Sequence, residues 1–150
     1  KSGTEFLVNT TTVADQTGAQ VTALNAGGYV VAWSDYSQSV DDPTHYAVRA
    51  QVFNADGTRR GSEFLVNTTT ADYQGDPRLS ALDDGGFVAV WSDYSQSSED
   101  SSGYAVRAQR FDANGQRLGA EFRKLQNGNI EYYLLGMVAG AVLLLLTLLI

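Results

Sequence analysis

The chain has 150 residues, with 17 acidic and 10 basic side chains, a net charge of −7 and no cysteine. The lack of cysteine excludes a disulfide scaffold, a cysteine-ligated zinc site and a thiol nucleophile. The acidic balance argues against nucleic acid as a partner, because binding to a phosphate backbone needs clustered lysine and arginine. A single histidine, His45, argues against a Ser-His-Asp triad.

The chain repeats itself at a step of 58 residues. Residues 3–60 align without a gap on residues 61–118, with 33 identities in 58 positions. The shared segments include EFLVNT, SDYSQS and YAVRAQ, and a third copy begins with GAEF at 119–122 and then departs from the pattern. We therefore expect two β repeats, at 3–60 and 61–118, and a truncated third repeat with a linker at 119–131.

Four short strand patterns recur within each repeat. In the first copy, residues 5–10, 19–24 and 46–53 alternate in side-chain character along the chain. Residues 29–33 read YVVAW, a continuous apolar run that is typical of a strand buried on both faces. Glycine-containing turn sequences separate the runs, because glycine supplies the positive φ that a tight turn requires; they lie at 25–28, 54–57, 83–86 and 112–115.

These patterns predict an all-β fold of tandem four-stranded antiparallel units that resemble β-propeller blades. A propeller needs about four to eight blades to close. Two repeats would therefore need further copies in a longer array, or closure by homo-oligomerisation. The alternative is a β-sandwich of two four-stranded sheets.

The motif EFLVNT…GGFV-x-x-W-S…Y-x-V-x-AQ resembles repeats of large secreted bacterial proteins that accompany RTX-type calcium-binding and adhesin modules. The resemblance covers residues 3–122. It implies an extracellular, β-rich repeat protein without enzymatic activity. The RTX nonapeptide GGxGxDxUx does not occur in the chain, so the resemblance assigns calcium to no residue.

Residues 132–150 carry no charge. As a helix they would measure about 28 Å, close to the hydrocarbon thickness of a bilayer, so we expect a C-terminal transmembrane helix. A buried core helix is the alternative. Residues 125–146 resemble the last helix of the large antiporter-like subunit of bacterial respiratory complex I, although no proton-channel residue of that family transfers. A fusion after Phe122 would also explain the change of pattern.

SDYSQS ends a buried run in each copy and opens a long polar loop. Its candidate ligand-binding residues are Asp35, Tyr36 and Gln38 in one copy and Asp93, Tyr94 and Gln96 in the other. Carboxylates beside hydroxyl oxygens suit Ca²⁺. The candidate metal ligands are Asp35, Asp41, Asp42, Asp93, Glu99 and Asp100. The alternative is a solvated acidic loop that satisfies its own backbone groups.

Two further residue pairs recur once in each repeat. Trp33 and Trp91 lie inside the apolar runs, so we expect them in the core. Arg49 and Arg107 alternate with apolar residues, which predicts ion pairs with acidic neighbours across strands.

Together these observations favour a noncatalytic cell-surface repeat module for adhesion or surface structure, anchored in a membrane at its C-terminus. Its expected partners are the membrane and a host or cell-surface protein or glycan. The alternative function is a membrane subunit fragment of a respiratory, energy-transducing complex fused to β repeats.

Overall fold

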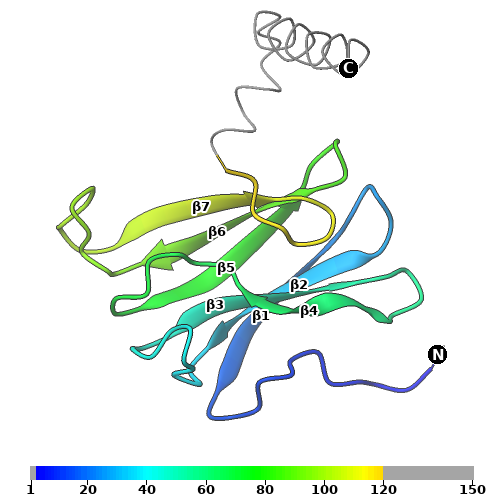
Figure 1. Ribbon diagram of the computed structural model, residues 1–150, viewed down its shortest axis with the longest axis horizontal. Coiled ribbons are helices and arrows are strands. Elements are labelled where there is room, and N and C mark those ends of the chain that lie inside the picture. Colours follow the sequence, from blue (N-terminus) through cyan, green and yellow to red (C-terminus); the bar gives the residue numbers. More distant parts are fainter. Residues whose placement is uncertain (1–2, 120–150) are drawn as a thin grey trace, which may run out of the picture. The chain divides into compact units, whose positions relative to one another are not determined.

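Seven strands form two antiparallel sheets in the computed structural model of the chain, which describes residues 3–119 (Figure 1). The order in the first sheet is β1-β2-β3-β4, and in the second it is β5-β6-β7. The predicted all-β antiparallel fold is confirmed. The strands are β1 (Gln16–Ala23), β2 (Tyr29–Asp35), β3 (Ala47–Phe53), β4 (Arg59–Leu65), β5 (Gln74–Ala81), β6 (Phe87–Asp93) and β7 (Ala105–Phe111).

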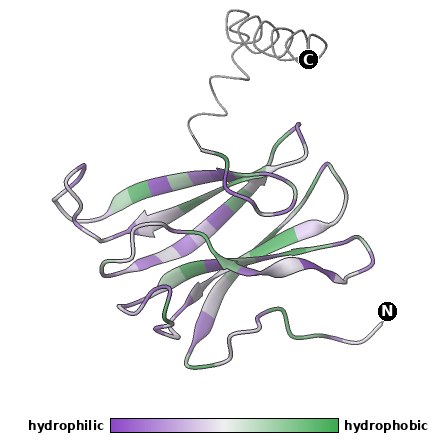
Figure 2. Ribbon diagram, viewed as in Figure 1, coloured by the Kyte–Doolittle hydropathy of each residue, from purple (hydrophilic) through white to green (hydrophobic). Residues whose placement is uncertain are grey.

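Both faces of the central hairpin β2–β3 are buried. Successive side chains of a strand point to opposite faces, so Val30 and Ala32 lie on one side and Val31 and Trp33 on the other. All four are at most 8% exposed, which confirms the two-sided burial predicted for the YVVAW run. Figure 2 shows a continuous hydrophobic stretch along β2, whereas hydrophobic and hydrophilic residues alternate along β7.

The main core lies where β5 packs across β1, β2 and β3. Trp91 of the second sheet joins this core and Trp33 packs in a second cluster on the opposite face, so both tryptophans are buried as predicted. The two sheets therefore stack face to face. The buried members of the main core are Leu24, Val30, Ala32, Val48, Ala50, Val52, Val66, Phe87, Ala89, Trp91 and Phe111.

The sheets are offset from the sequence repeats. The predicted strand at 5–10 is wrong for the first copy: residues 3–15 form no strand and run beside the first sheet (Figure 1). Of the equivalent residues 63–68 of the second copy, 63–65 lie in β4, which pairs with β3 of the preceding repeat. A strand needs a partner edge, and no strand precedes residues 3–15 within the described part of the chain.

Segment 3–15 nevertheless covers part of the first sheet. The Phe6 ring lies 5.6 Å from the Phe53 ring, and Val8 packs against the cluster formed by Val31, Trp33 and Phe53. The next repeat makes the same contacts: the rings of Phe64 and Phe111 are 5.5 Å apart. Segment 3–15 therefore packs on the first sheet in the way that the end of β4 and the residues after it pack on the second sheet.

The second sheet has three strands among the described residues, not the predicted four. After β7 the chain makes one isolated bridge, between Phe111 and Arg117. The rest of the third copy and the predicted membrane helix at 132–150 lie outside the described residues. Within residues 3–119, no helix is long and apolar enough to cross a membrane.

Two glycines in the turn between β1 and β2 are required for different reasons, one for backbone conformation alone and one for close packing as well. Gly27 and Gly28 both have positive φ, at 88° and 84°. A Cβ on Gly27 would meet nothing within 4 Å, whereas a Cβ on Gly28 would clash with the Phe53 carbonyl oxygen. Gly28 is therefore required by packing as well as by backbone conformation.

We expect Gly28→Ala to destabilise the fold by about 1–3 kcal/mol more than Gly27→Ala, because overpacking adds to the conformational cost that both variants share. Urea unfolding followed by tryptophan fluorescence would measure the difference, since the chain's two tryptophans lie in the two sheets. Equal midpoints for the two variants would contradict the assigned contact.

Candidate functional site

An ion pair lies buried on the first sheet where SDYSQS ends β2. The Arg49 Nε donates to Asp35 Oδ2 at 2.9 Å, and the two side chains are 6% and 1% exposed. Asp35 is opposite Ala47 in the strand register, so Arg49 is its diagonal neighbour on the same face. The predicted pairing of Arg49 with an acidic residue across strands is confirmed.

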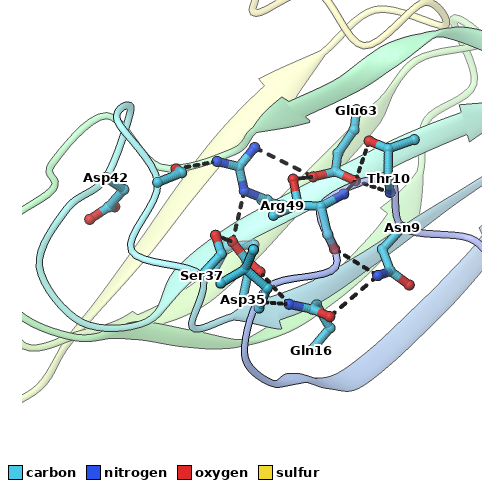
Figure 3. A network of polar contacts seen from close by, with 12 residues as sticks. Asn9, Thr10, Gln16, Asp35, Ser37, Asp42, Arg49 and Glu63 are labelled. Carbon is cyan, nitrogen blue, oxygen red and sulfur yellow. Dashed lines mark hydrogen bonds and ion pairs between the residues drawn. The ribbon is translucent and has the colours of Figure 1, made fainter.

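Neighbouring side chains occupy the remaining hydrogen-bonding positions of this pair (Figure 3). Ser37 Oγ donates to Asp35 Oδ2 at 2.5 Å, and Gln16 Nε2 donates to Asp35 Oδ1 at 3.0 Å. The other nitrogens of Arg49 contact Ser39 Oγ at 2.5 Å and Glu63 Oε1 at 3.5 Å. Both oxygens of Asp35 are therefore engaged within the fold.

The second repeat builds the same pair. Arg107 Nε donates to Asp93 Oδ2 at 2.6 Å, which confirms the corresponding prediction, and Ser95 and Gln74 donate to the same carboxylate. Burial would raise the pKa of Asp93, but these three donors outweigh it and hold the pKa below its usual 3.8. Arg107 is more open than Arg49, at 22% exposed, and it also pairs with Glu99.

Glu63 links the first sheet to the N-terminal segment. Its carboxylate accepts from the Thr10 backbone N–H at 2.6 Å and from the Thr10 and Thr11 hydroxyls at 2.9 and 2.7 Å. Burial acts to raise the pKa of Glu63, and the donors from Thr10 and Thr11 lower it further than burial raises it. Glu63 lies in a bulged part of β4, where the register with β3 shifts.

Asp42 is the one candidate metal ligand of the first polar loop that is buried, at 1% exposed. It accepts from Asn67 Nδ2 at 2.8 Å and from the Thr44 hydroxyl at 3.3 Å. Burial raises the pKa of Asp42 despite these donors. Asp42 therefore connects the loop of the first repeat to the segment between β4 and β5.

The other candidate metal ligands are dispersed. Asp41, Glu99 and Asp100 are exposed, and Glu99 is paired with Arg107. Among residues 3–119, no group of three or more His, Cys, Asp or Glu side chains is placed to hold a metal ion. The predicted Ca²⁺ site stays a prediction for this loop.

A row of five tyrosines joins the two repeats. It contains the predicted candidates Tyr36 and Tyr94 and three residues that the sequence did not single out. Ring centroids are 4.7 Å apart for Tyr36–Tyr46, 5.6 Å for Tyr46–Tyr73, 6.0 Å for Tyr73–Tyr104 and 4.8 Å for Tyr104–Tyr94. We call these residues the tyrosine row: Tyr36, Tyr46, Tyr73, Tyr94 and Tyr104.

Tyr73 holds the middle of the tyrosine row. Its hydroxyl donates to Asp76 Oδ2 at 3.1 Å. Burial, with the nearby charge of Asp76, raises the pKa of Tyr73 to about 12, so the hydroxyl keeps its proton at neutral pH. Tyr46 and Tyr104 both begin the repeated segment YAVRAQ, so the repeat could have identified them as candidates. Tyr73 stands where the first copy has Asp15, so no repeated pattern identifies it.

Gln38 and Gln96 follow the tyrosines Tyr36 and Tyr94 in a left-handed conformation, with φ of 49° and 48°. Few non-glycine residues adopt this region. Gln38 Nε2 donates to the Thr44 carbonyl at 2.7 Å and so closes the first loop. The structure thus places Gln38 in a loop-closing role. Both glutamines are exposed, whereas Tyr36 and Tyr94 are half-buried.

Comparison of the chain with protein-family models, with curated proteins and with solved structures found no match.

We expect Asp35→Asn to destabilise the protein by about 3–5 kcal/mol, because it leaves the buried Arg49 charge poorly compensated. Asp93→Asn should cost less, about 1–3 kcal/mol, since water reaches the more exposed Arg107. Urea unfolding would measure both. Asp41→Asn, on the same loop but exposed, is the control and should stay within about 0.5 kcal/mol of wild type. An Asp93 variant as costly as the Asp35 variant would contradict the argument.

Acid should remove the contribution of Glu63. A carboxyl whose pKa is lower in the folded than in the unfolded state stabilises the fold above its unfolded pKa and loses this effect as pH falls through the folded value. The difference in unfolding free energy between wild type and Glu63→Gln should therefore be largest at neutral pH. It should shrink as the pH falls from about 5 through 4.5, the usual pKa of a glutamate, and below.

Unfolding midpoints across this pH range would measure the contribution of Glu63. Glu99→Gln serves as the control, because Glu99 is 80% exposed and also contacts a repeat arginine. A Glu63 effect that does not change with pH would argue against the lowered pKa.

Proposed function

We propose that this chain is a noncatalytic repeat module of the cell surface, acting in adhesion or surface structure and anchored in a membrane by its C-terminal segment. The observation that carries the proposal is the tyrosine row. It is a chain of aromatic rings at most 6.0 Å apart that spans both repeats, and Tyr104 is 64% exposed.

Tyrosine suits a contact surface because it combines a large rigid ring with a hydroxyl and loses little conformational entropy on binding. It is also enriched at protein interfaces. In the tyrosine row the rings support one another by tilted and edge-on contacts, which hold them in place before a partner arrives. Such a surface suits the apolar face of a sugar ring or a peptide segment.

The polar groups of the repeated motif support a binding role over catalysis. Asp35 and Asp93 are both 1% exposed, and each carboxylate accepts hydrogen bonds from an arginine, a serine and a glutamine. A carboxylate engaged in this way stabilises the sheet. The side chains of the motif that remain for a partner include Tyr36 and Tyr94, which follow these aspartates in the chain.

We further propose that the two stacked sheets are propeller-blade-like units. The packing of β5 across β1–β3 supports this arrangement, since blades of a propeller stack face to face from their inner strands.

The adhesion proposal is tested by binding of the full chain to immobilised neutral oligosaccharides and to whole cells. Tyr104→Ala should lower binding at least tenfold, and Tyr94→Ala should lower it in the same direction, because each removes one ring of the closest pair in the second repeat. Val40→Ala is the matched control, since Val40 is 95% exposed on the first polar loop and has no ring.

If both tyrosine variants bind as well as the wild type, the role assigned to the tyrosine row is wrong. If the wild-type chain binds neither surface, adhesion itself is excluded and surface structure remains as the proposed role.

A further inference from the structure

The second sheet exposes a face that the first sheet buries. We use the term trailing face for the side of each sheet that carries Val30, Ala32, Val48 and Ala50 in the first repeat and their counterparts 58 residues later in the second. In the first sheet these four side chains are fully buried, because the second sheet covers them. In the second sheet Val106 is 83% exposed and Ala108 is exposed as well.

A hollow of about 230 Å³ marks the trailing face of the second sheet. Its lining includes Ser92, Val90 and Val106. In the first sheet the counterpart of Ser92 is Ser34, whose hydroxyl accepts from the Asp76 backbone N–H at 3.0 Å. The first residues of β5 therefore occupy in the first sheet the place that is hollow in the second.

The complementary half of the same junction is exposed on β1. Strand β5 packs Leu79 against the main core and buries Pro77. The counterparts on β1 are Val21, which is 66% exposed, and Ala19, which is exposed. The chain thus presents both halves of an interface that it already forms once internally.

The polar contacts of the internal junction have retained counterparts too. Gln74 N donates to the Tyr46 carbonyl at 2.8 Å, and the matching groups on the two exposed surfaces belong to Gln16 and Tyr104. Thr44 Oγ1 donates to the Thr70 carbonyl at 2.6 Å. The groups that match this pair are the hydroxyl of Ser102 and the carbonyl of residue 12, again a threonine.

Asn67 makes the most specific of these contacts. It is fully buried, its Oδ1 accepts from Val48 N at 2.8 Å, and its Nδ2 donates to Asp42. The counterparts of Val48 and Asp42 are Val106 and Asp100 on the second repeat. The third copy, GAEF, is followed by Arg and Lys and therefore lacks the Val-Asn pair that would match Val66–Asn67. The pair that could contact Val106 and Asp100 is Val8–Asn9 of the first copy.

From these matches we infer that a second copy of this chain docks head to tail on the second sheet, with its β1 across the trailing face and its Val8–Asn9 beside β7. The contact is heterologous, because one copy contributes its first sheet and the other its second. Repetition of such a contact generates a ring if the rotation closes and a filament if it does not.

The trailing face of the second sheet differs from that of the first at several positions, among them Val90 in place of Ala32 and two added charges. Arg78 and Arg110 replace Gln20 and Val52, and Arg110 pairs with Asp84. Charge on the rim of an apolar face disfavours non-specific collapse onto it. The contact between copies is therefore weaker than the covalently linked internal junction, and its population rises with protein concentration.

Cysteine cross-linking tests the geometry, since the chain has no cysteine of its own. A Cβ at Gly75 would lie 3.1 Å from Ser34 Oγ, so the counterpart positions 17 and 92 of two docked copies fall within disulfide reach. Full-length Thr17→Cys and Ser92→Cys variants are purified separately in detergent, mixed and mildly oxidised. A non-reducing gel should show covalent dimers from the mixture and only monomers from either variant alone.

The double variant Thr17→Cys/Ser92→Cys should give a ladder of dimers, trimers and larger species. Adding Val106→Asp to the Ser92→Cys variant should abolish the dimers and leave the urea midpoint unchanged, because Val106 is exposed within one copy. A mixture without dimers, from variants that keep the wild-type urea midpoint, overturns the proposal. Dimers formed equally by a single variant also overturn it, since they show a symmetric or tail-driven contact.

Discussion

The buried arginine–aspartate pair is the interaction on which the first sheet depends. Because both faces of β2 and β3 are covered, the polar residues at their ends cannot reach bulk water and must satisfy one another. Arg49 does so for three elements at once: β2 through Asp35, the polar loop through Ser39, and β4 through Glu63. Glu63 in turn holds Thr10 and Thr11. One guanidinium therefore sets the positions of the loop, the outer strand and the incoming segment relative to the hairpin.

Strand periodicity and the internal repeat allowed the core to be predicted from sequence. The YVVAW run, the two tryptophans and the Arg49 and Arg107 pairs were found as expected, because each depends on local alternation that is visible in a single strand. The strand expected at 5–10 was not found. Its first three residues recur at the end of β4, but pairing depends on a neighbouring edge, and no local pattern encodes whether that edge is present.

The candidate site was harder to predict for a related reason. Asp35 and Asp93 have the residue type and the loop position of cation ligands. Besides the serine two positions on, however, their carboxylates accept from a glutamine and an arginine that lie 19 and 14 positions away in the chain. Only the folded sheet brings those donors together. Tyr73 illustrates the same limit, because it interrupts the repeat and gains its place between Tyr46 and Tyr104 from the stacking of the two sheets.

The offset between sheet and repeat has a consequence for how such a chain grows. Strand β4 closes the first sheet, but five of its seven residues belong by sequence to the second repeat. Segment 66–72 then leads to the next sheet. The stretch of gene that is duplicated is therefore not the stretch that folds as a unit. Each added copy completes the sheet of its predecessor. In an array lengthened in this way, no boundary between repeats would allow one repeat to separate without breaking a sheet.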